Sequence, residues 1–405
     1  MSERRVVITG LGVVSSIGLG KDEFWKGLCA GRSGISEVSI FDTSGYPVHR
    51  AGEVKNFEPG SFIPKNKLKG MARASQFVVA AAKMALEDAG LAEGELKNTT
   101  TGTVMGTTMA NIQSLEQIDK HWTEKGEDDV WPINIIKYPS NSLSDNIGYF
   151  FGITGPNYSI PTACSAGNYS IGYSFDLIRQ NKADIMIAGG ADPFSRITFT
   201  GFNRLYAMAP EKCQPFDKNR KGMMVGEGAG VLLLESLDYA LKRNADIYAE
   251  VLGYALSCDA HHMTAPSMEG IIHVMRKALK NAGIRTDEVD YISAHGTGTP
   301  ANDKTECAAV KAVFGAKYKE IPMSSIKSML GHTMGAASAL EAIACCLAIK
   351  ESIIPPTINC ETPDPECDID CVPNKSRNHP VKVALNNSLA FGGNDACLVL
   401  KKYSS

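Results

Sequence analysis

The sequence predicts an α/β fold built from two copies of one unit, and three observations support this. Short β-branched runs alternate with longer amphipathic or apolar stretches, which is the pattern of an α/β protein with mostly internal strands. Each half of the chain contains five such runs. In each half the third run leads through a tight turn into a long helix. The boundary falls near Lys242–Asp246, so the predicted units are residues 1–245 and 246–405.

The strands are expected in both halves with no linker between them. The ten expected strands are Val6–Thr9, Thr103–Gly106, Tyr158–Ile160, Asp184–Ala188 and Gly230–Leu234, then Tyr248–Leu256, Val289–Ala294, Met323–Ile326, Val381–Asn386 and Ala396–Leu400. The helix after each third strand shows apolar residues at helical spacing, namely Ile171, Phe175 and Ile178 in the first half and Leu340, Ile343 and Leu347 in the second. The two halves should therefore pack as one body.

Composition and charge exclude several classes of protein. Of the 405 residues, 44% are hydrophobic, and 41 basic against 44 acidic side chains give a net charge of -3. This balance offers no general attraction to nucleic acid or membrane, and no segment has the apolar length that spans a bilayer. The 11 cysteines form none of the C-x-x-C pairs of a zinc or redox site. Reduced thiols in the cytoplasm fit this usage best, and no metal site is expected.

Three segments that look like motifs are expected to be turns or loops. Gly10 and Gly12 follow the first strand but lack the third glycine of a dinucleotide-binding turn, and Gly226–Gly230 lacks the Lys and Ser/Thr of a phosphate loop. His261 and His262 have no partner at metal-ligand spacing, so they are interpreted as part of a loop. The apolar run at Val6–Ile8 is interrupted too soon by polar residues for a secretory signal.

One cysteine differs from the other ten in its surroundings. Cys164 lies within Pro161–Gly167, whose sequence is Pro-Thr-Ala-Cys-Ser-Ala-Gly, where a helix is expected to follow a strand. Backbone N–H groups and the helix dipole at such a position stabilise an anion, so the pKa of the thiol should fall. The small neighbours leave room for a substrate. Most of the other cysteines are interpreted as small buried hydrophobic residues, and Cys164 as a nucleophile.

Two histidines follow strands in the second half. His295 ends a strand within Ser293–Pro300, and His332 lies in a later strand-to-helix turn; ligands gather at the carboxyl ends of strands in open α/β sheets. By itself, His295 is as readily explained as a structural histidine. Glu341 lies in the apolar helix that follows. Because an isolated buried carboxylate is costly, it needs a partner, and Lys327 is the nearby cation.

A further turn, at Asn386–Gly393, places Phe391 before two glycines. It is either a β-turn with a core aromatic side chain or a turn whose N–H groups form half of an oxyanion hole.

A cysteine followed much later by a histidine suits two enzyme classes. A papain-like protease places its histidine roughly 130–150 residues after the cysteine, and His295 lies in that window. The flanking papain motif and a secretory signal are absent, however, whereas the second class uses one cysteine with two histidines.

Together, these four segments closely resemble the elongating β-ketoacyl-acyl carrier protein synthases of the thiolase superfamily. The resemblance covers essentially the whole chain and is specific in the ordered set Thr-Ala-Cys, Ala-His-Gly-Thr-x-Thr-Pro, Lys-Ser-Met-x-Gly-His and Phe-Gly-Gly. It implies a thiolase-like fold with duplicated five-stranded mixed-sheet halves in a layered α-β-α-β-α arrangement. The elongating class is favoured because the initiating class uses Cys, His and Asn, whereas here His332 follows His295.

The resemblance implies a decarboxylative Claisen condensation that follows a ping-pong route. Cys164 would accept the acyl chain from acyl carrier protein as a thioester, and malonyl-acyl carrier protein would then lose carbon dioxide and attack it. His295 and His332 would promote decarboxylation and stabilise the enolate oxygen as neutral or hydrogen-bond-donating imidazoles. Lys327 and Glu341 would hold the histidines in place.

The resemblance also implies the remaining roles. The N–H groups of Cys164 and Phe391 would form the oxyanion hole, with Phe391 gating entry, and Thr297 and Thr299 would bind the phosphopantetheine arm. Met109 would lie near the acyl pocket, and no redox cofactor or metal is required. Carrier protein is acidic, so a basic dock is expected. A basic stretch supplies the charges, although a solvated face explains them equally well; its residues are Lys65, Lys67, Lys69 and Arg73.

Departures from the fatty-acid pattern leave the pathway open. The residues at Ser165–Gly167 and Asn394–Asp395 differ from the common ones and resemble ketosynthases of type II polyketide or polyene pathways. The protein should form a homodimer or a heterodimer with a chain-length factor, a related partner that usually lacks the nucleophile. A non-catalytic role like that of such a partner is the alternative. The presence of Cys164, His295 and His332 favours a catalytic role.

Overall fold

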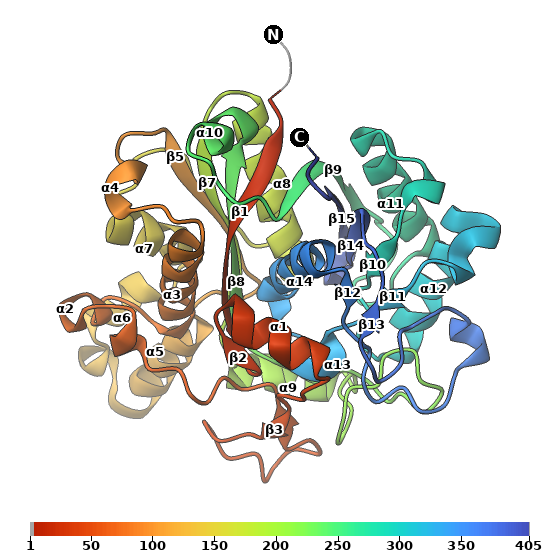
Figure 1. The fold of residues 1–405 in the computed structure, drawn as a ribbon. Helices are drawn as coiled ribbons and strands as arrows, with labels where there is room; N and C mark the ends of the chain where they lie inside the picture. Colours follow the sequence, from red (N-terminus) through yellow and green to blue (C-terminus); the bar gives the residue numbers. More distant parts are fainter. Residues whose placement is uncertain (1–3, 405) are drawn as a thin grey trace.

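The computed structural model describes residues 4–404 and folds them around one mixed β-sheet (Figure 1). The strand order is β11-β10-β14-β15-β9-β1-β8-β7-β5-β6. These strands are β1 (Val6–Ser15), β5 (Thr101–Gly106), β6 (Asn157–Ile160), β7 (Ile185–Asp192), β8 (Gly228–Ser236), β9 (Ala249–Cys258), β10 (Tyr291–Ser293), β11 (Met323–Ser324), β14 (Val383–Ser388) and β15 (Asn394–Lys401). All ten strands predicted from the sequence are present, with their ends shifted by up to six residues.

The two halves of the sheet have the same topology. In each half the first strand leads to the fifth, then to the fourth, the second and the third. The inner pairs β5–β6, β5–β7, β10–β11 and β10–β14 are parallel, and the pairs that involve a first or fifth strand are antiparallel. The predicted duplication of a five-stranded mixed unit is therefore confirmed. The sequence did not predict that β1 and β9 also pair, through Val6–Ile8, and so join the halves into one sheet.

Helices cover the sheet in three layers, which confirms the predicted α-β-α-β-α arrangement (Figure 1). One outer layer contains α3 (Arg73–Asp88) and α7 (Ser142–Phe151), and the other contains α11 (Met268–Ala282) and α12 (Pro300–Phe314). Between them lie α8 (Ala166–Arg179) and α14 (Ala337–Glu351). All of α14 except its last two residues is buried, as expected for a helix that is apolar on every face.

Shorter elements complete the chain. The other helices are α1 (Lys21–Cys29), α2 (Lys65–Leu68), α4 (Glu93–Leu96), α5 (Ile112–Lys125), α6 (Pro132–Lys137), α9 (Arg196–Arg204), α10 (Leu237–Lys242) and α13 (Lys327–Leu330). The remaining strands are β2 (Gly18–Leu19), β3 (Ser36–Glu37), β4 (Arg50–Ala51), β12 (Ile353–Ile354) and β13 (Arg377–Asn378). The predicted boundary lies between α10 and β9, and a division into two domains there stays a prediction. No helix within residues 4–404 is long and apolar enough to cross a membrane.

The expectation that two glycine-rich segments form turns is wrong. Gly10 and Gly12 lie inside β1, where a Cβ on Gly12 would come 1.8 Å from the carbonyl oxygen of Ala81 in α3. Glycine is needed because the backbones of the helix and the strand touch. In Gly226–Gly230, the last three residues belong to β8, and a Cβ on Gly226 would lie 2.6 Å from the carbonyl oxygen of Leu330.

Candidate active site

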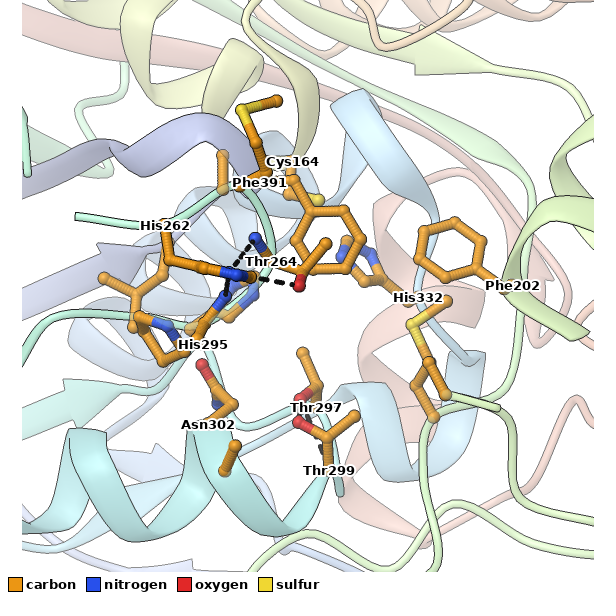
Figure 2. Close-up of a pocket in the computed structure, with 18 of the residues that line it drawn as sticks. Cys164, Phe202, His262, Thr264, His295, Thr297, Thr299, Asn302, His332 and Phe391 are labelled. Carbon is orange, nitrogen blue, oxygen red and sulfur yellow. Dashed lines mark hydrogen bonds between the residues drawn. The ribbon is translucent and has the colours of Figure 1, made fainter. Parts of the chain in front are cut away.

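Residues from all four predicted segments line one pocket between the two halves of the molecule (Figure 2). The predicted site residues in its wall are Cys164, His295, Thr297, Thr299, His332 and Phe391. They come from turns at the ends of β6, β10 and β14 and from the turn that precedes α14. The turn that carries Cys164 and the corresponding turn of the second half, which carries His332, therefore face the same pocket.

Cys164 lies in a single 3-10 turn, Ala163–Ser165, between β6 and α8. Ala163 has a φ of 52°, a left-handed conformation that costs an L-residue free energy. Contacts with the second half hold the turn, because the Ser165 hydroxyl donates to the Asn394 carbonyl at 2.6 Å and the Ser388 hydroxyl donates to the Cys164 carbonyl at 3.1 Å. The thiol is thus presented by a strained turn that both halves stabilise.

The predicted lowering of the thiol pKa is wrong. Burial raises the pKa of Cys164 to about 12, and the effect exceeds the opposing influence of the Lys327 ammonium and of the N–H groups of Phe391 and Cys164. The thiol is therefore neutral at pH 7. The two N–H groups nevertheless point at the sulfur, which is the arrangement expected of an oxyanion hole.

The two histidines lie at right angles beside each other, with ring centroids 5.5 Å apart and an interplanar angle of 81°. Nδ1 of His295 is 3.4 Å from Nζ of Lys327, and Nδ1 of His332 accepts a hydrogen bond from the Met334 N–H at 3.2 Å. Burial and the Lys327 charge lower the pKa of both histidines well below its usual value. A neutral imidazole whose Nδ1 accepts must carry its proton on Nε2, so both rings are hydrogen-bond donors at Nε2.

A buried ion pair supports His295. The Lys327 ammonium bonds to the Glu341 carboxylate and to the carbonyl oxygen of His295 at 2.6 Å, and all three side chains are almost fully buried. The expected partner of Glu341 is therefore present. Burial raises the pKa of Glu341 to about 7, against the lowering effect of Lys327.

Sequence reasoning missed two acidic residues that hold these turns. Glu306 of α12 accepts the N–H groups of His295 and Gly296 at 2.8 and 2.9 Å. Asp192, at the end of β7, accepts four hydrogen bonds of 2.6–2.9 Å, which come from Thr107, Thr108, Met109 and Gly335. Asp192 could have been found from the sequence, because it is a charged residue at the end of a buried strand. Glu306 lies within a helix that contains several other charged residues, so the sequence offers no signal that distinguishes it.

Phe391 closes one side of the pocket, where its ring is 40% exposed and lies 5.8 Å from that of Phe202 (Figure 2). The following Gly392 has a φ of 81°, and its N–H donates to the Met263 carbonyl at 2.9 Å. The segment 259–266, which contains the two histidines interpreted from sequence as part of a loop, thus also lines the pocket. Opposite it, the hydroxyls of Thr297 and Thr299 are 2.9 Å apart.

Some predicted residues lie elsewhere. Met109 is not part of the pocket wall; its sulfur accepts a hydrogen bond from the Thr198 hydroxyl at 3.1 Å, and its role in an acyl pocket stays a prediction. Within residues 4–404, no group of three or more His, Cys, Asp or Glu side chains could hold a metal ion.

The predicted basic stretch is not uniform. Lys65 and Lys69 are exposed, whereas the ammonium of Lys67 packs 4.5 Å from the centre of the Phe150 ring. Arg73 is half-buried, and its guanidinium forms two bonds of 2.8 and 2.6 Å to the fully buried Glu227. This pairing favours a structural role for Arg73, and its role in docking stays a prediction.

The fold and this pocket define a thiolase-type condensing enzyme. A family model described as the N-terminal domain of β-ketoacyl synthase matches residues 3–240, and one described as the C-terminal domain matches residues 248–361. The chain therefore belongs to the β-ketoacyl synthase family, as the sequence predicted, and is an acyltransferase.

Relatives and solved structures agree with this family. The chain is 40% identical to a 3-oxoacyl-[acyl-carrier-protein] synthase 2 of Synechocystis over 100% of this chain and 99% of the relative, and 39% identical to one of Staphylococcus aureus over 99% of each. The solved ishigamide ketosynthase/chain length factor is 47% identical, covers both chains completely and superposes with a TM-score of 0.97. A type II polyketide ketosynthase, solved in complex with its acyl carrier protein, is 34% identical with complete coverage and a TM-score of 0.92.

Proposed function

We propose that this chain is a catalytic ketosynthase that extends an acyl chain held on Cys164 with a unit from malonyl-acyl carrier protein. One observation carries the proposal, namely that a thiol faced by two N–H groups shares its pocket with two neutral imidazoles whose Nε2 atoms carry protons. A chain-length-factor-like role needs none of these groups, and a protease would need only one of the histidines.

In the first half-reaction the Cys164 sulfur attacks the thioester carbonyl of the acyl carrier protein. Negative charge then develops on the carbonyl oxygen, where the N–H groups of Cys164 and Phe391 stabilise it. The phosphopantetheine thiolate leaves and takes up the proton that Cys164 loses. Because the resting thiol is neutral, this proton transfer has to accompany the attack rather than precede it.

In the second half-reaction the malonyl thioester loses carbon dioxide and becomes an enolate. The two Nε2–H groups of His295 and His332 stabilise the charge on its oxygen, which lowers the barrier to decarboxylation. The enolate carbon attacks the Cys164 thioester, and the carbon–sulfur bond breaks to release the 3-oxoacyl product and the Cys164 thiolate, which takes up a proton from water. Thr297 and Thr299 would hold the phosphopantetheine arm. These steps need neither a redox cofactor nor a metal.

We further propose a type II polyketide pathway and a chain-length factor as the partner subunit. The identity of 47% to the ishigamide ketosynthase/chain length factor, against 40% to the Synechocystis synthase, supports this choice.

We also propose that the protein acts in the cytoplasm. All 11 cysteines are free thiols, which suits a reducing compartment.

The test is a reconstituted condensation. The purified chain, alone and with a co-purified partner subunit, receives malonyl-acyl carrier protein and acyl-acyl carrier proteins of graded length and unsaturation. Mass spectrometry of the carrier should reveal 3-oxoacyl products one malonyl-derived unit longer. An acyl adduct on Cys164 without any condensation product, in all combinations, would overturn the proposed function. Equal rates with saturated and unsaturated primers would remove the support for a polyketide pathway.

A further inference from the structure

Two cysteines lie together outside the pocket. The sulfur atoms of Cys360 and Cys371 are 3.5 Å apart, in the segment that joins β12 to β13, shown in blue in Figure 1. We propose that Cys360 and Cys371 form a redox-active thiol pair that a hydroperoxide converts to a reversible disulfide. The proposal goes beyond the condensation reaction, because neither thiol lines the active-site pocket.

The geometry requires little movement. A disulfide has a sulfur–sulfur distance of about 2.05 Å, so the two atoms must approach each other by roughly 1.5 Å. Neither cysteine belongs to a helix or a strand, so no regular hydrogen-bond ladder opposes this shift. The chain near Cys371 is already held close to Cys360, because the side-chain amide of Asn374 donates to the Cys360 carbonyl at 2.6 Å.

The two thiols have unequal environments, which assigns their roles. Cys371 is half-buried, whereas Cys360 is buried. A hydroperoxide therefore reaches Cys371 more readily, which makes Cys371 the nucleophile and Cys360 the resolving thiol. A hydrogen bond between the two thiols lowers the pKa of Cys371 and so favours its thiolate. Cys164 differs, because burial raises its pKa to about 12 and slows its own oxidation.

The chemistry balances with one hydroperoxide. The Cys371 thiolate attacks the terminal peroxide oxygen, the oxygen–oxygen bond breaks, and Cys371 becomes a sulfenic acid while the alcohol or water leaves. The Cys360 sulfur then attacks the Cys371 sulfur, and the sulfenic oxygen leaves as water with the Cys360 proton. Two thiols are oxidised and one peroxide is reduced by the same two electrons. A dithiol reductant reverses the reaction.

The bond would tighten a loop that is tied to the segment 217–220. Asp364 of this loop pairs with Arg220, and the N–H groups of Glu361 and Thr362 both donate to Asp217 at 2.7 Å. None of these contacts has to break when the disulfide forms. We therefore expect the oxidised protein to retain its condensing activity and to unfold at a higher temperature, since a cross-link restricts the unfolded chain.

The experiment treats the reduced full chain with a small excess of hydrogen peroxide, blocks the remaining thiols with N-ethylmaleimide and records the intact mass. The expected product carries two maleimides fewer than the untreated protein, and dithiothreitol restores both. Cleavage after Glu361 and Glu366 places Cys360 on a different peptide from Cys367 and Cys371, so a cross-linked peptide pair shows that Cys360 is bonded to one of these two. The Cys371→Ser and Cys367→Ser variants then decide which of the two it is. Cys360→Ser and Cys371→Ser should both abolish the bond and keep the reduced protein active.

Two further variants make the result specific. Cys367→Ser tests the third cysteine of the segment, and Cys29→Ser tests a half-buried cysteine elsewhere, on α1. Both should oxidise as the unmodified chain does. The proposal fails if the maleimide loss persists in Cys360→Ser or Cys371→Ser, if it disappears in Cys367→Ser, or if the cross-linked peptides contain Cys307.

Discussion

The ammonium of Lys327 lies 2.6 Å from the carbonyl oxygen of His295 and 3.4 Å from Nδ1 of the same residue. One cation thus holds the backbone of the histidine, selects the tautomer of its ring and disfavours its protonation. Glu341 balances the charge of that cation in the interior. In the proposed mechanism His295 acts as a neutral imidazole, and burial together with the Lys327 charge keeps it neutral at a pH where a free histidine would already be charged.

Lys327→Met should therefore shift the pH profile of condensation. Lys327 lowers the pKa of both His295 and His332, so its loss raises both values and the histidines become protonated at a higher pH. The acidic limb of the single-turnover rate should move to higher pH, and the rate at pH 8 should fall about 10-fold or more because His295 loses its orientation.

Controls for this variant separate the charge from the fold. Glu341 alone would remain as an unpaired buried carboxylate, so Lys327→Met combined with Glu341→Met should recover part of the stability. Lys350→Met breaks a surface pair with Asp246 and should leave the profile unchanged. An acidic limb at the same pH in Lys327→Met would contradict the assigned role.

Cys164→Ala should abolish the acyl-enzyme and leave the fold intact. The turn is held through the Cys164 carbonyl and through the Ser165 hydroxyl, so loss of the thiol leaves these contacts in place. Intact-protein mass spectrometry after incubation with acyl-acyl carrier protein should find no adduct. Cys213→Ala is the matched control, because burial also raises the pKa of that thiol to about 12. An adduct on the Cys164 variant would exclude Cys164 as the nucleophile.

His295→Ala and His332→Ala should still be acylated but condense about 10²- to 10⁴-fold more slowly. In the proposed mechanism the histidines stabilise the enolate, which forms only in the second half-reaction, whereas the oxyanion hole of the first consists of backbone groups. Mass spectrometry measures the acylation and a malonyl-acyl carrier protein assay measures the condensation. His379→Ala, at a half-buried position outside the pocket, should affect neither step. Full condensation activity in both pocket variants would rule out the two-histidine mechanism.

The sequence predicted most of the fold and most of the turns that line the pocket, for reasons that particular residues make clear. Strands and turns are local patterns, so the ten strands and the turns at Cys164, His295, His332 and Phe391 could be found from them. The pKa of Cys164 could not, because burial depends on how the halves pack. The buried partner of Arg73 could not be predicted for the same reason, since Glu227 is distant in sequence.

Gly393→Ala should damage the enzyme more than Gly392→Ala does. Both glycines have positive φ values, 75° and 81°, so either substitution strains the backbone. However, a Cβ on Gly393 would come 2.0 Å from an oxygen of Asp259, whereas a Cβ on Gly392 has no neighbour closer than 3.6 Å. The shift would displace the Phe391 N–H, and removal of one oxyanion donor costs on the order of 10²-fold in rate. Equal acylation rates in the two variants would contradict the role of this turn.

The basic stretch near α2 should divide into one pair of docking residues and one structural arginine. Charge reversal at the exposed Lys65 and Lys69 should raise KM for acyl-acyl carrier protein several-fold with little change in kcat, and the effect should shrink at high salt. Arg73→Ala should instead leave Glu227 buried without its partner and reduce the free energy of unfolding by about 3 kcal/mol, the low end for a buried pair because Arg73 is partly exposed. Steady-state kinetics at two ionic strengths and urea unfolding measure the two effects. A stable Arg73→Ala protein with a raised KM would support Arg73 as a docking residue.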